Sequence, residues 1–393
     1  MSSGLTPTEK VLSGKESSEK AVSKLNSAPP KHGGDLAYWQ RKVGNQALNW
    51  LDLSSACNRE PWPIPTIEPE HWMSLPDQTA LLDTAENYYG RRPAALGAGS
   101  QHIIESLPLL IKENKEIKES RSLKSNIVFV PRIGYQEHAF AWQKWGFELA
   151  YYDSIATLLD ENFAVAVIIQ PNNPTGEWTE ADTLSAVIQH AEQLGASLVV
   201  DEAFIDPCPE RSLLAQNAVE LWPESLFVLR SVGKFFGLAG ARVGFVFCAD
   251  KWQTILKNLM GPWPVATPSL HLVCLAFADV EWQTQAIDSL KRRQTAFIER
   301  VMPKFNTIFD SQDSVLNPLF ITWTLDSHEY AEQVFDMLHQ VGIHTRLGEG
   351  WIRVALPAME EIPVLDKALI QLLRGAGGQN QGPNTGMTRG ELA

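Results

Sequence analysis

The amino-acid sequence predicts an α/β protein with two parts: a large domain with a mostly parallel sheet covered by helices, and a smaller α+β domain. Three observations support this fold class. Short apolar runs alternate with longer amphipathic segments along the first two thirds of the chain, the pattern changes after Gly261-Pro262, and 393 residues are enough for two domains.

Five short runs in the first part are rich in Val, Ile and Phe, the composition of buried strands. A helical segment, Glu180–Gly195, lies between two of them, has apolar residues at helical spacing and ends on a glycine. Strands separated by helices are typical of a parallel sheet with helices on its faces. The five runs are Asn126–Val130, Phe163–Ile169, Ala196–Asp201, Ser225–Ser231 and Val243–Cys248.

The second part has a different order of elements. A long amphipathic stretch, Leu270–Arg300, leads to "LFITWTL" from Leu319, a helical pattern around Tyr330–Val341, and "GWIRVAL" from Gly350. This succession predicts the smaller α+β domain. A cleft between the two parts is the expected place for a ligand.

Composition excludes several classes of protein. The net charge of -13 disfavours nucleic acid and anionic membranes as partners. Neither an apolar run long enough to cross a bilayer nor the core of a signal peptide occurs, so we expect a cytoplasmic protein. The four cysteines form no CxxC pair, which predicts buried thiols and no metal site. Residues 1–30 and 375–393 are polar, and we expect them to be a disordered and a mobile tail.

Lys234 stands in an apolar, glycine-rich stretch, "RSVGKFFGLAGARVGF", that begins at Arg230. It could be a surface lysine whose stem lies on apolar residues. A P-loop is excluded because Val228 replaces the first glycine and Phe235 follows the lysine, and no GxGxxG occurs. The alternative to a surface lysine is a lysine that loses its proton and reacts with an aldehyde, and both interpretations stay open at this point.

Polar residues follow the predicted strands, at the edge where α/β sheets bind ligands. Small and polar residues open a helical pattern after Leu96, and a helix N-terminus binds phosphate readily. Pyridoxal phosphate needs a lysine for its aldehyde, a carboxylate for its pyridine nitrogen, a polar group for its ring oxygen and a cradle for its phosphate. The chain offers these in order: Lys234, Asp201, Asn173, and the set Ser100, Gln101, Ser231 and Arg242.

Several motifs resemble those of the fold-type-I pyridoxal phosphate enzymes, the aspartate aminotransferase superfamily. They are "NNPTG" from Asn172, "DEAF" from Asp201, and the S-x-x-K and G-x-x-x-x-R-x-G patterns around Lys234. The resemblance covers nearly everything between the tails. It implies a large domain with a mostly parallel seven-stranded sheet at residues 61–268, a small domain at 269–374, an N-terminal arm at 31–60 that joins the small domain and the active site, and a homodimer.

Four stretches are similar, more narrowly, to threonine-phosphate decarboxylases of cobalamin biosynthesis. They are "HGGDLAYW" from His32, "WLDLSSACNREPWP" from Trp50, "GSQ" at Gly99, and the Lys234 stretch followed by "GPWPV". The resemblance implies a pyridoxal 5'-phosphate cofactor bound covalently by Lys234, with Asp201 on the pyridine nitrogen and Asn173 on the ring hydroxyl. It also implies a phosphate cradle of Gly99, Ser100, Gln101, Ser231 and Arg242.

The same resemblance assigns the remaining site residues. Tyr89 would reach the phosphate of a partner subunit, and Arg353 would bind the substrate carboxylate. His138 occupies the position of the ring that stacks on the pyridine, although Tyr135 is the alternative because of extra residues before it. His32, Gly33 and Arg346 are candidates for binding a phosphorylated amino acid, with a turn cap and a surface arginine as the structural alternatives for the first and the last.

Two positions depart from the family pattern. Phe204 stands where many aminotransferases carry a tyrosine, so one hydrogen bond to the ring hydroxyl is missing, and Arg59 replaces a proline after Asn58. Two other functions remain open: a histidinol-phosphate aminotransferase, which shares fold and cofactor, and a non-catalytic domain of the same fold that serves as sensor or scaffold. The preferred reaction is decarboxylation of L-threonine O-3-phosphate.

Overall fold

The structure is a computed structural model that describes residues 34–44, 49–113, 126–215 and 222–378. Of these, residues 60–287 form a large compact unit, and residues 34–59 together with 288–378 form a small one. The second boundary falls at residues 287 and 288, inside a helix, whereas the sequence places it at 268 and 269. The expected tails at 1–30 and 379–393 lie outside the described residues.

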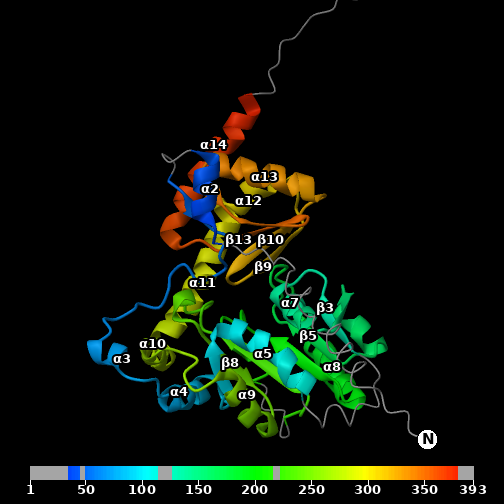
Figure 1. Ribbon diagram of the computed structural model, residues 1–393. Coiled ribbons are helices and arrows are strands. Elements are labelled where there is room, and N and C mark those ends of the chain that lie inside the picture. The colour runs from blue at the N-terminus through cyan, green and yellow to red at the C-terminus, as the bar shows by residue number, and fades with distance from the viewer. Residues whose placement is uncertain (1–33, 45–48, 114–125, 216–221, 379–393) are drawn as a thin grey trace, which may run out of the picture. The chain divides into compact units, whose positions relative to one another are not determined.

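The large unit contains the expected α/β architecture (Figure 1). Its seven-stranded sheet has the order β2-β8-β7-β6-β5-β3-β4, in which β8 runs antiparallel to β2 and β7 while the other neighbours are parallel. The mostly parallel seven-stranded sheet of the prediction is therefore confirmed. The strands are β2 (Ala95–Ala98), β3 (Ile127–Pro131), β4 (Glu148–Tyr152), β5 (Val165–Ile169), β6 (Ser197–Asp201), β7 (Leu226–Ser231) and β8 (Val243–Phe247).

Helices and short 3-10 turns connect these strands. Asp279 separates two helices in the stretch that reads as one amphipathic segment, because its carboxylate accepts the Trp282 N–H at the start of the second. The helices are α3 (Pro69–Met73), α4 (Thr79–Tyr89), α5 (Gly99–Glu113), α7 (Glu137–Lys144), α8 (Ala181–Leu194), α9 (Gln253–Met260), α10 (Thr267–Ala278) and α11 (Val280–Arg300), and the 3-10 turns are η1 (Ile155–Asp160), η2 (Pro209–Arg211), η3 (Ala239–Ala241) and η4 (Asp250–Trp252).

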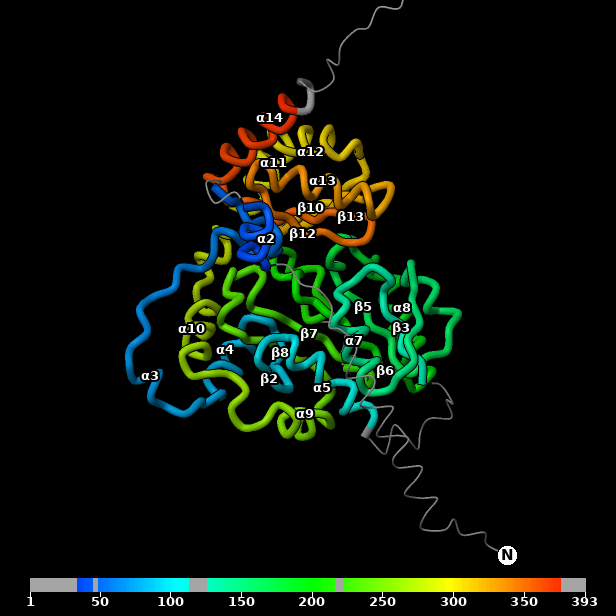
Figure 2. Tube along the Cα trace, turned by 45° about the horizontal axis from the view of Figure 1, so that its top comes forward, coloured from blue at the N-terminus to red at the C-terminus, as the bar shows by residue number. Residues whose placement is uncertain are grey.

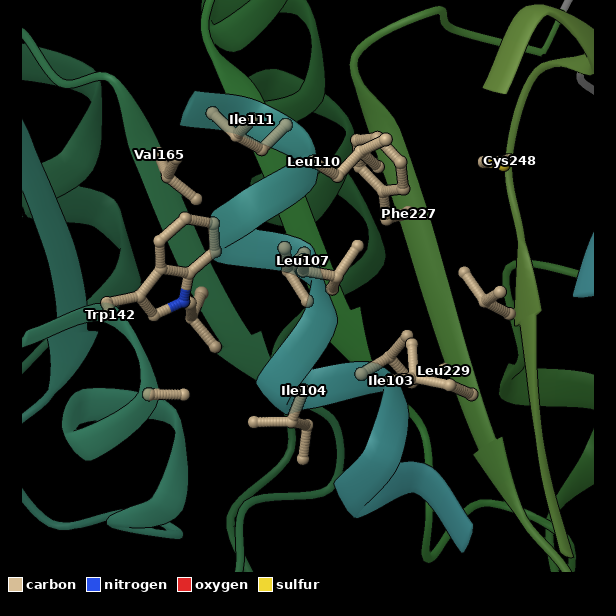
Figure 3. Close-up of a cluster of buried hydrophobic side chains, with 14 of the residues drawn as sticks. Ile103, Ile104, Leu107, Leu110, Ile111, Trp142, Val165, Phe227, Leu229 and Cys248 are labelled. Carbon is tan, nitrogen blue, oxygen red and sulfur yellow. The ribbon is translucent and has the colours of Figure 1, made fainter. Parts of the chain in front are cut away.

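Helix α5 fixes the core of the large unit. One face of it is apolar at helical spacing, and Ile103, Leu107 and Ile111 are at most 1% exposed. Figure 3 shows this face lying across the strands, with Leu107 and Leu110 directed toward Phe227 and its neighbours. Each such side chain contributes roughly 1.5–3 kcal/mol by leaving water. This packing holds the N-terminus of α5 directly after the carboxyl end of β2.

The small unit is built on a four-stranded antiparallel sheet of order β12-β13-β10-β9, with a separate parallel pair β1–β11. Figure 2 shows α12, α13 and α14 together with these strands. Its elements are α2 (Leu36–Val43), β1 (Leu51–Asp52), the end of α11, α12 (Met302–Phe309), β9 (Ser314–Asn317), β10 (Phe320–Thr324), α13 (His328–Gln340), β11 (Ile343–His344), β12 (Arg346–Gly348), β13 (Trp351–Ala355), η5 (Met359–Glu361) and α14 (Ile362–Gly378).

Two pieces of chain that are far apart in sequence form this small unit. Leu51 pairs with Ile343 in the β1–β11 ladder, and the guanidinium of Arg59 donates two hydrogen bonds, of 2.6 and 2.5 Å, to the carboxylate of Glu361. Arg59 is the residue that departs from the family's proline. Its bidentate ion pair gives that departure a structural role, because it ties the early segment to the start of α14.

Candidate active site

The predicted cofactor residues of the large unit gather at the carboxyl ends of β5, β6 and β7. Asp201 ends β6, Ser231 ends β7, and Asn173 follows β5. The ladders pair Ile169 with Asp201, and Asp201 with Leu229, so these three strand ends lie side by side. Side chains at this edge of a parallel sheet converge on a ligand.

Two glycines allow close packing at the N-terminus of α5. Gly99 has φ +76°, and a Cβ there would lie 2.6 Å from Nη2 of Arg242. A Cβ on Gly244 would lie 2.3 Å from the backbone nitrogen of Ser100. The register pairs Gly244 with Ser231. Ser231, Arg242 and the first turn of α5 therefore meet at one place, as a phosphate cradle requires.

Arg242 supplies the positive charge of this cradle. It adopts the left-handed backbone conformation with φ 53°, and the hydrogen bonds that its guanidinium makes to described residues are long ones, of 3.4 and 3.5 Å, to the carbonyls of Ala98 and Ala239. No ion pair of Arg242 occurs among the described residues. A guanidinium that contacts only carbonyls, next to a helix N-terminus, suits a bound phosphate.

Gln101 has a different environment from the one expected of a phosphate ligand. Its side-chain amide donates to Glu137 at 2.9 Å and Glu105 at 3.2 Å, and its carbonyl accepts a 3.1 Å hydrogen bond from the Tyr135 hydroxyl. Glu137 is 6% exposed and was not singled out in the sequence, where nothing but its place beside His138 marks it. The network positions the Tyr135 ring.

Asp201 is buried, and each of its carboxylate oxygens has one hydrogen-bond partner. Its Oδ1 accepts the backbone N–H of Ala203 at 3.0 Å, and its Oδ2 lies 2.9 Å from Nε2 of His138, which is 1% exposed. The structure thus places His138 on the carboxylate, whereas the resemblance implies that it stacks on the pyridine. Tyr135, whose ring centroid is 6.2 Å from that of His138, remains the candidate for the stacking position.

Lys234 follows β7 and is half-buried. Its Nζ lies 5.1 Å from the ring centroid of Phe204, three residues after Asp201. Arg230, the charged neighbour noted in the sequence, belongs to a separate buried cluster: it pairs with Glu202 at 3.1 Å and with Asp206 at 2.5 Å. Burial raises the pKa of Glu202, and the charge of Arg230 partly offsets this.

Tyr89 lies inside the large unit. It is 6% exposed, its ring packs edge-on against Phe245 and Phe277, and the guanidinium of Arg230 is 4.5 Å from its centroid. Burial, followed by the charge of Asp206, raises the pKa of Tyr89 well above its usual value. This interior position differs from the reach to a partner's phosphate that the resemblance implies.

A cavity of about 560 Å³ adjoins Tyr89 and Arg230. It is lined by side chains of α4, α10, α11 and the segment around Asp206, and it includes Phe235, the residue after Lys234. Tyr89 is the one predicted cofactor residue among its lining residues. The cradle at the N-terminus of α5 is therefore a different place from this cavity.

Two of the predicted substrate residues, Arg346 and Arg353, lie in the small unit, whereas Asn173, which was also predicted to bind substrate, lies in the large unit. Arg353 on β13 pairs directly with Arg346 on β12, and Nη2 of Arg353 donates to the backbone carbonyl of Ser54 at 2.6 Å. Burial, followed by the like charge of Arg346, lowers the pKa of Arg353 to about 9, so its guanidinium stays charged at neutral pH. His32 and Gly33 lie outside the described residues.

Comparison with known proteins decides the family. Residues 84–369 match the model of "Aminotransferase class I and II". The chain belongs to the class I and II aminotransferase family. None of its described helices is long and apolar enough to cross a membrane.

Two curated relatives of this aminotransferase-family protein are threonine-phosphate decarboxylases. That of Pseudomonas aeruginosa is 35% identical over 263 residues, 64% of this chain and 72% of the relative. That of a Sinorhizobium species is 32% identical over 252 residues, 63% and 71% of the two chains. A histidinol-phosphate aminotransferase of Sodalis glossinidius is 34% identical, over 40% of each chain.

Solved structures show the same fold. Histidinol-phosphate aminotransferase from Sinorhizobium meliloti, solved in complex with pyridoxal-5'-phosphate, has a TM-score of 0.70 and 18% identity, with 96% of this chain and 99% of that chain covered. The enzyme from Clostridium acetobutylicum has a TM-score of 0.68 and 20% identity, with 83% and 99% covered. These likenesses confirm the predicted fold-type-I architecture.

Proposed function

We propose that this protein is a pyridoxal 5'-phosphate-dependent carboxy-lyase. Its reaction is the decarboxylation of L-threonine O-3-phosphate to (R)-1-amino-2-propanol O-2-phosphate, a step of cobalamin biosynthesis. The observation that carries the proposal is the sheet edge where a charged cradle, a buried carboxylate and Lys234 come together. The names of the two relatives with the longest matches described above support the substrate.

The residues at this edge fit the cofactor. Gly99, Ser100, Ser231 and Arg242 would hold its phosphate, because two glycines there leave room that a Cβ would fill. Asp201 would hold the protonated pyridine nitrogen, and Lys234 would bind the aldehyde. Asn173, half-buried after β5, would meet the ring oxygen.

Pyridoxal phosphate, when bound, withdraws electrons from the bond that is cleaved at the substrate's Cα. The chain's part is to choose the bond and manage protons. Asp201, held by His138, would accept the N–H of the pyridine ring, and Lys234 would be the group that returns a proton to Cα. An arginine that binds the substrate carboxylate would orient the substrate and so select the bond that is cleaved.

Two arginines suit a substrate with two anionic ends. Arg353 would bind the carboxylate, which its planar guanidinium can hold with two hydrogen bonds. Arg346, its partner across the β12–β13 ladder, and His32 would bind the substrate's phosphate. The pair brings two positive charges into one part of the small unit.

We also propose that the enzyme is a cytoplasmic homodimer. Large apolar side chains on the surface of the large unit would be buried by a second copy, as interfaces between subunits require. They include Ile64 at 62% exposed, Trp72 at 69%, Met73 at 75%, Leu75 at 70% and Trp263 at 57%. The four cysteines are free thiols, which a reducing compartment preserves.

The experiment is to incubate the holoenzyme with threonine phosphate and no 2-oxo acid. Release of one carbon dioxide per substrate, dependent on pyridoxal phosphate, is the expected result. Lys234→Ala should abolish it, and borohydride should attach the cofactor to Lys234 of the wild type. A histidinol-phosphate aminotransferase would release no carbon dioxide and would consume histidinol phosphate with a 2-oxo acid. No turnover of either substrate would support the sensor or scaffold.

A further inference from the structure

A chain of hydrogen bonds runs through the interior of the small unit. Nε2 of His339 lies 2.9 Å from Nδ1 of His344, and Nε2 of His344 lies 3.2 Å from Oδ1 of Asp35. Both imidazoles are 1% exposed. His339 belongs to α13, His344 to β11, and Asp35 directly precedes α2, so the chain joins the N-terminal segment to the body of the unit.

Two neutral rings satisfy the pattern of donors and acceptors. Asp35 accepts the Nε2 proton of His344, so Nδ1 of His344 has only a lone pair and accepts the Nε2 proton of His339. Nδ1 of His339 is buried and has no hydrogen-bond partner among the described residues. The Trp50 ring, 5.4 Å away, carries a buried indole N–H that also lacks a partner there, and it is a donor.

A further proton on either ring lacks an acceptor among the described residues. On Nδ1 of His339 it would form a buried N–H that no described residue accepts. On Nδ1 of His344 it would face the N–H of His339, unless that ring moved its proton to its own Nδ1, for which the described part of the chain likewise offers no acceptor. A buried charge with an unpaired donor costs several kcal/mol unless the surroundings move.

Helix α2 has few contacts that hold it to the small unit. None of its residues is buried. Its Trp39 ring packs 4.8 Å from His339 and 5.0 Å from Phe335, and Asp35 anchors its start. With so little apolar area covered, the docking of α2 depends on these few contacts.

The same segment reaches the candidate carboxylate anchor. The backbone N–H of Gly34, next to Asp35, donates to Oγ of Ser54 at 3.0 Å. The carbonyl of Ser54 accepts the 2.6 Å hydrogen bond from Arg353. Ser54 thus contacts both the N-terminal segment and the arginine.

We propose that His339 and His344 are positioning residues that hold α2 and Gly34 against Ser54 only while both rings are neutral, so that acid releases this segment and weakens binding of the substrate at Arg353. The expected effect on substrate binding rests on the function proposed above. The release of α2 by acid does not depend on that function.

The charged groups around the pair come from three elements. Asp35 and Lys42 face it from the α2 segment, Asp52 from β1, and Arg346 from β12. Burial, followed by His344, lowers the pKa of His339 to about 4. Burial also lowers the pKa of His344, against the opposing effect of Asp52 and Asp35.

Acid should weaken the docking of α2. A histidine whose pKa is lowered in the docked state stabilises docking fully above its free value near 6.5 and loses this as pH falls toward the docked value. The titration of His339 alone should lower the equilibrium constant for docking of α2 by up to about tenfold between pH 7.5 and pH 5.5.

The primary experiment is hydrogen exchange of the full-length holoenzyme, read on the peptide that covers residues 34–43. After correction for the intrinsic effect of pH on exchange, the wild type should lose protection there by up to about tenfold between pH 7.5 and 5.5. A peptide from α8 serves as the internal reference and should not change. Equal protection of the 34–43 peptide at the two values would overturn the proposal.

Three variants separate the causes. Asp35→Ala, at a half-exposed side chain, should raise exchange at both pH values. His339→Phe combined with His344→Gln removes both titrating rings and should make exchange of the 34–43 peptide independent of pH, after correction for the intrinsic effect. If this double variant still loses protection at pH 5.5 as the wild type does, other groups cause the pH dependence. His190→Gln, on α8 of the large unit, is the matched control and should keep the wild-type pH response. If the double variant fails to fold, Asp35→Ala alone tests the proposal. Wild-type protection of the 34–43 peptide in Asp35→Ala would show that Asp35 does not hold α2 in place.

Steady-state kinetics test whether release of the α2 segment weakens substrate binding at Arg353. In Asp35→Ala, KM for threonine phosphate should rise several-fold while kcat changes little, because Lys234 and Asp201 lie in the other unit. An unchanged KM with increased exchange would reject the effect on substrate binding and leave the release of α2 standing. If no decarboxylation occurs at all, the proposed function fails, and the exchange result is unaffected.

Discussion

Gly99 and Gly195 share a positive φ, of 76° and 62°, but differ in what surrounds them. At Gly99 a Cβ would meet the guanidinium of Arg242, whereas at Gly195 there is open space. Both Gly→Ala variants should lose roughly 1 kcal/mol of stability from backbone strain. Only Gly99→Ala should also weaken pyridoxal phosphate binding, by at least about tenfold, because Arg242 must move. Titration of the apoenzyme measures this, and equal affinity in the two variants would contradict the cradle.

His138 offers a second test on single residues. His138→Phe keeps a ring in the buried position but removes the N–H that faces Asp201. Losing a hydrogen bond to a charged group costs about 1.5–3 kcal/mol, so kcat should fall roughly 10- to 100-fold while cofactor remains attached to Lys234. Rescue by His138→Gln, whose amide can donate, would distinguish positioning of the carboxylate from packing. Full activity of His138→Phe would remove His138 from the site.

Sequence reasoning found residues whose chemistry is unusual for their surroundings. Lys234 in an apolar stretch and Asp201 at a strand end stood out because burial of a charge needs a reason. It could not find that His138 faces Asp201 or that Gln101 binds Glu137, since each pair is far apart in the chain and is brought together by helix α7. The role of Tyr89 is similarly set by its aromatic neighbours.

At the scale of elements, the buried cluster at the end of β7 joins that strand to the segment after β6. Arg230→Met would leave Glu202 and Asp206 buried without a cation and should cost about 3–5 kcal/mol of the free energy of unfolding. Without the opposing charge of Arg230, the pKa of Glu202, which burial already raises, would rise further in the folded state, so stability should be better retained at pH 5.5 than at pH 8.

Urea unfolding at the two pH values measures this cost. Arg132→Met is the matched control, because Arg132 pairs with Asp153 on the surface and such pairs contribute about 0–1 kcal/mol. Similar losses in the two variants, or a larger loss for Arg230→Met at pH 5.5 than at pH 8, would contradict the interpretation of the cluster.

The strands divide into those that sequence could predict and those it could not. Five apolar runs agree with β3 and with β5 to β8 to within about two residues, because strands buried on both faces are continuously apolar. The sequence did not reveal β2 or β4. The first has four residues, Ala-Leu-Gly-Ala, without a β-branched side chain, and the second is a half-exposed edge strand. Pairing with β8 and β3 determines them, and pairing is not local.

At the scale of the whole molecule, the function proposed above gives Arg346 and Arg353 of the small unit to the substrate, and Lys234 and Asp201 of the large unit to the chemistry. Arg346→Ala should reduce kcat/KM for threonine phosphate roughly 10- to 100-fold and leave the weak reaction of threonine nearly unchanged. Arg353→Ala should reduce kcat/KM for both, since both carry the carboxylate. Steady-state kinetics with the two substrates, after circular dichroism shows intact folds, measure this. Equal losses on both substrates in Arg346→Ala would show that it supports the site rather than reads the phosphate.

The pairing of Leu51 with Ile343 and of Arg59 with Glu361 has a consequence for how the chain is made. Residues 60–287 emerge from the ribosome as one continuous stretch, and a unit of this kind can begin to fold during translation. The early segment of the small unit has to wait until nearly 300 further residues have been translated before its partners exist. Nascent chains that stop before Ile343 therefore contain β1 without its partner strand and Arg59 without the carboxylate of Glu361. Chaperones that bind stalled nascent chains would encounter both segments unpaired.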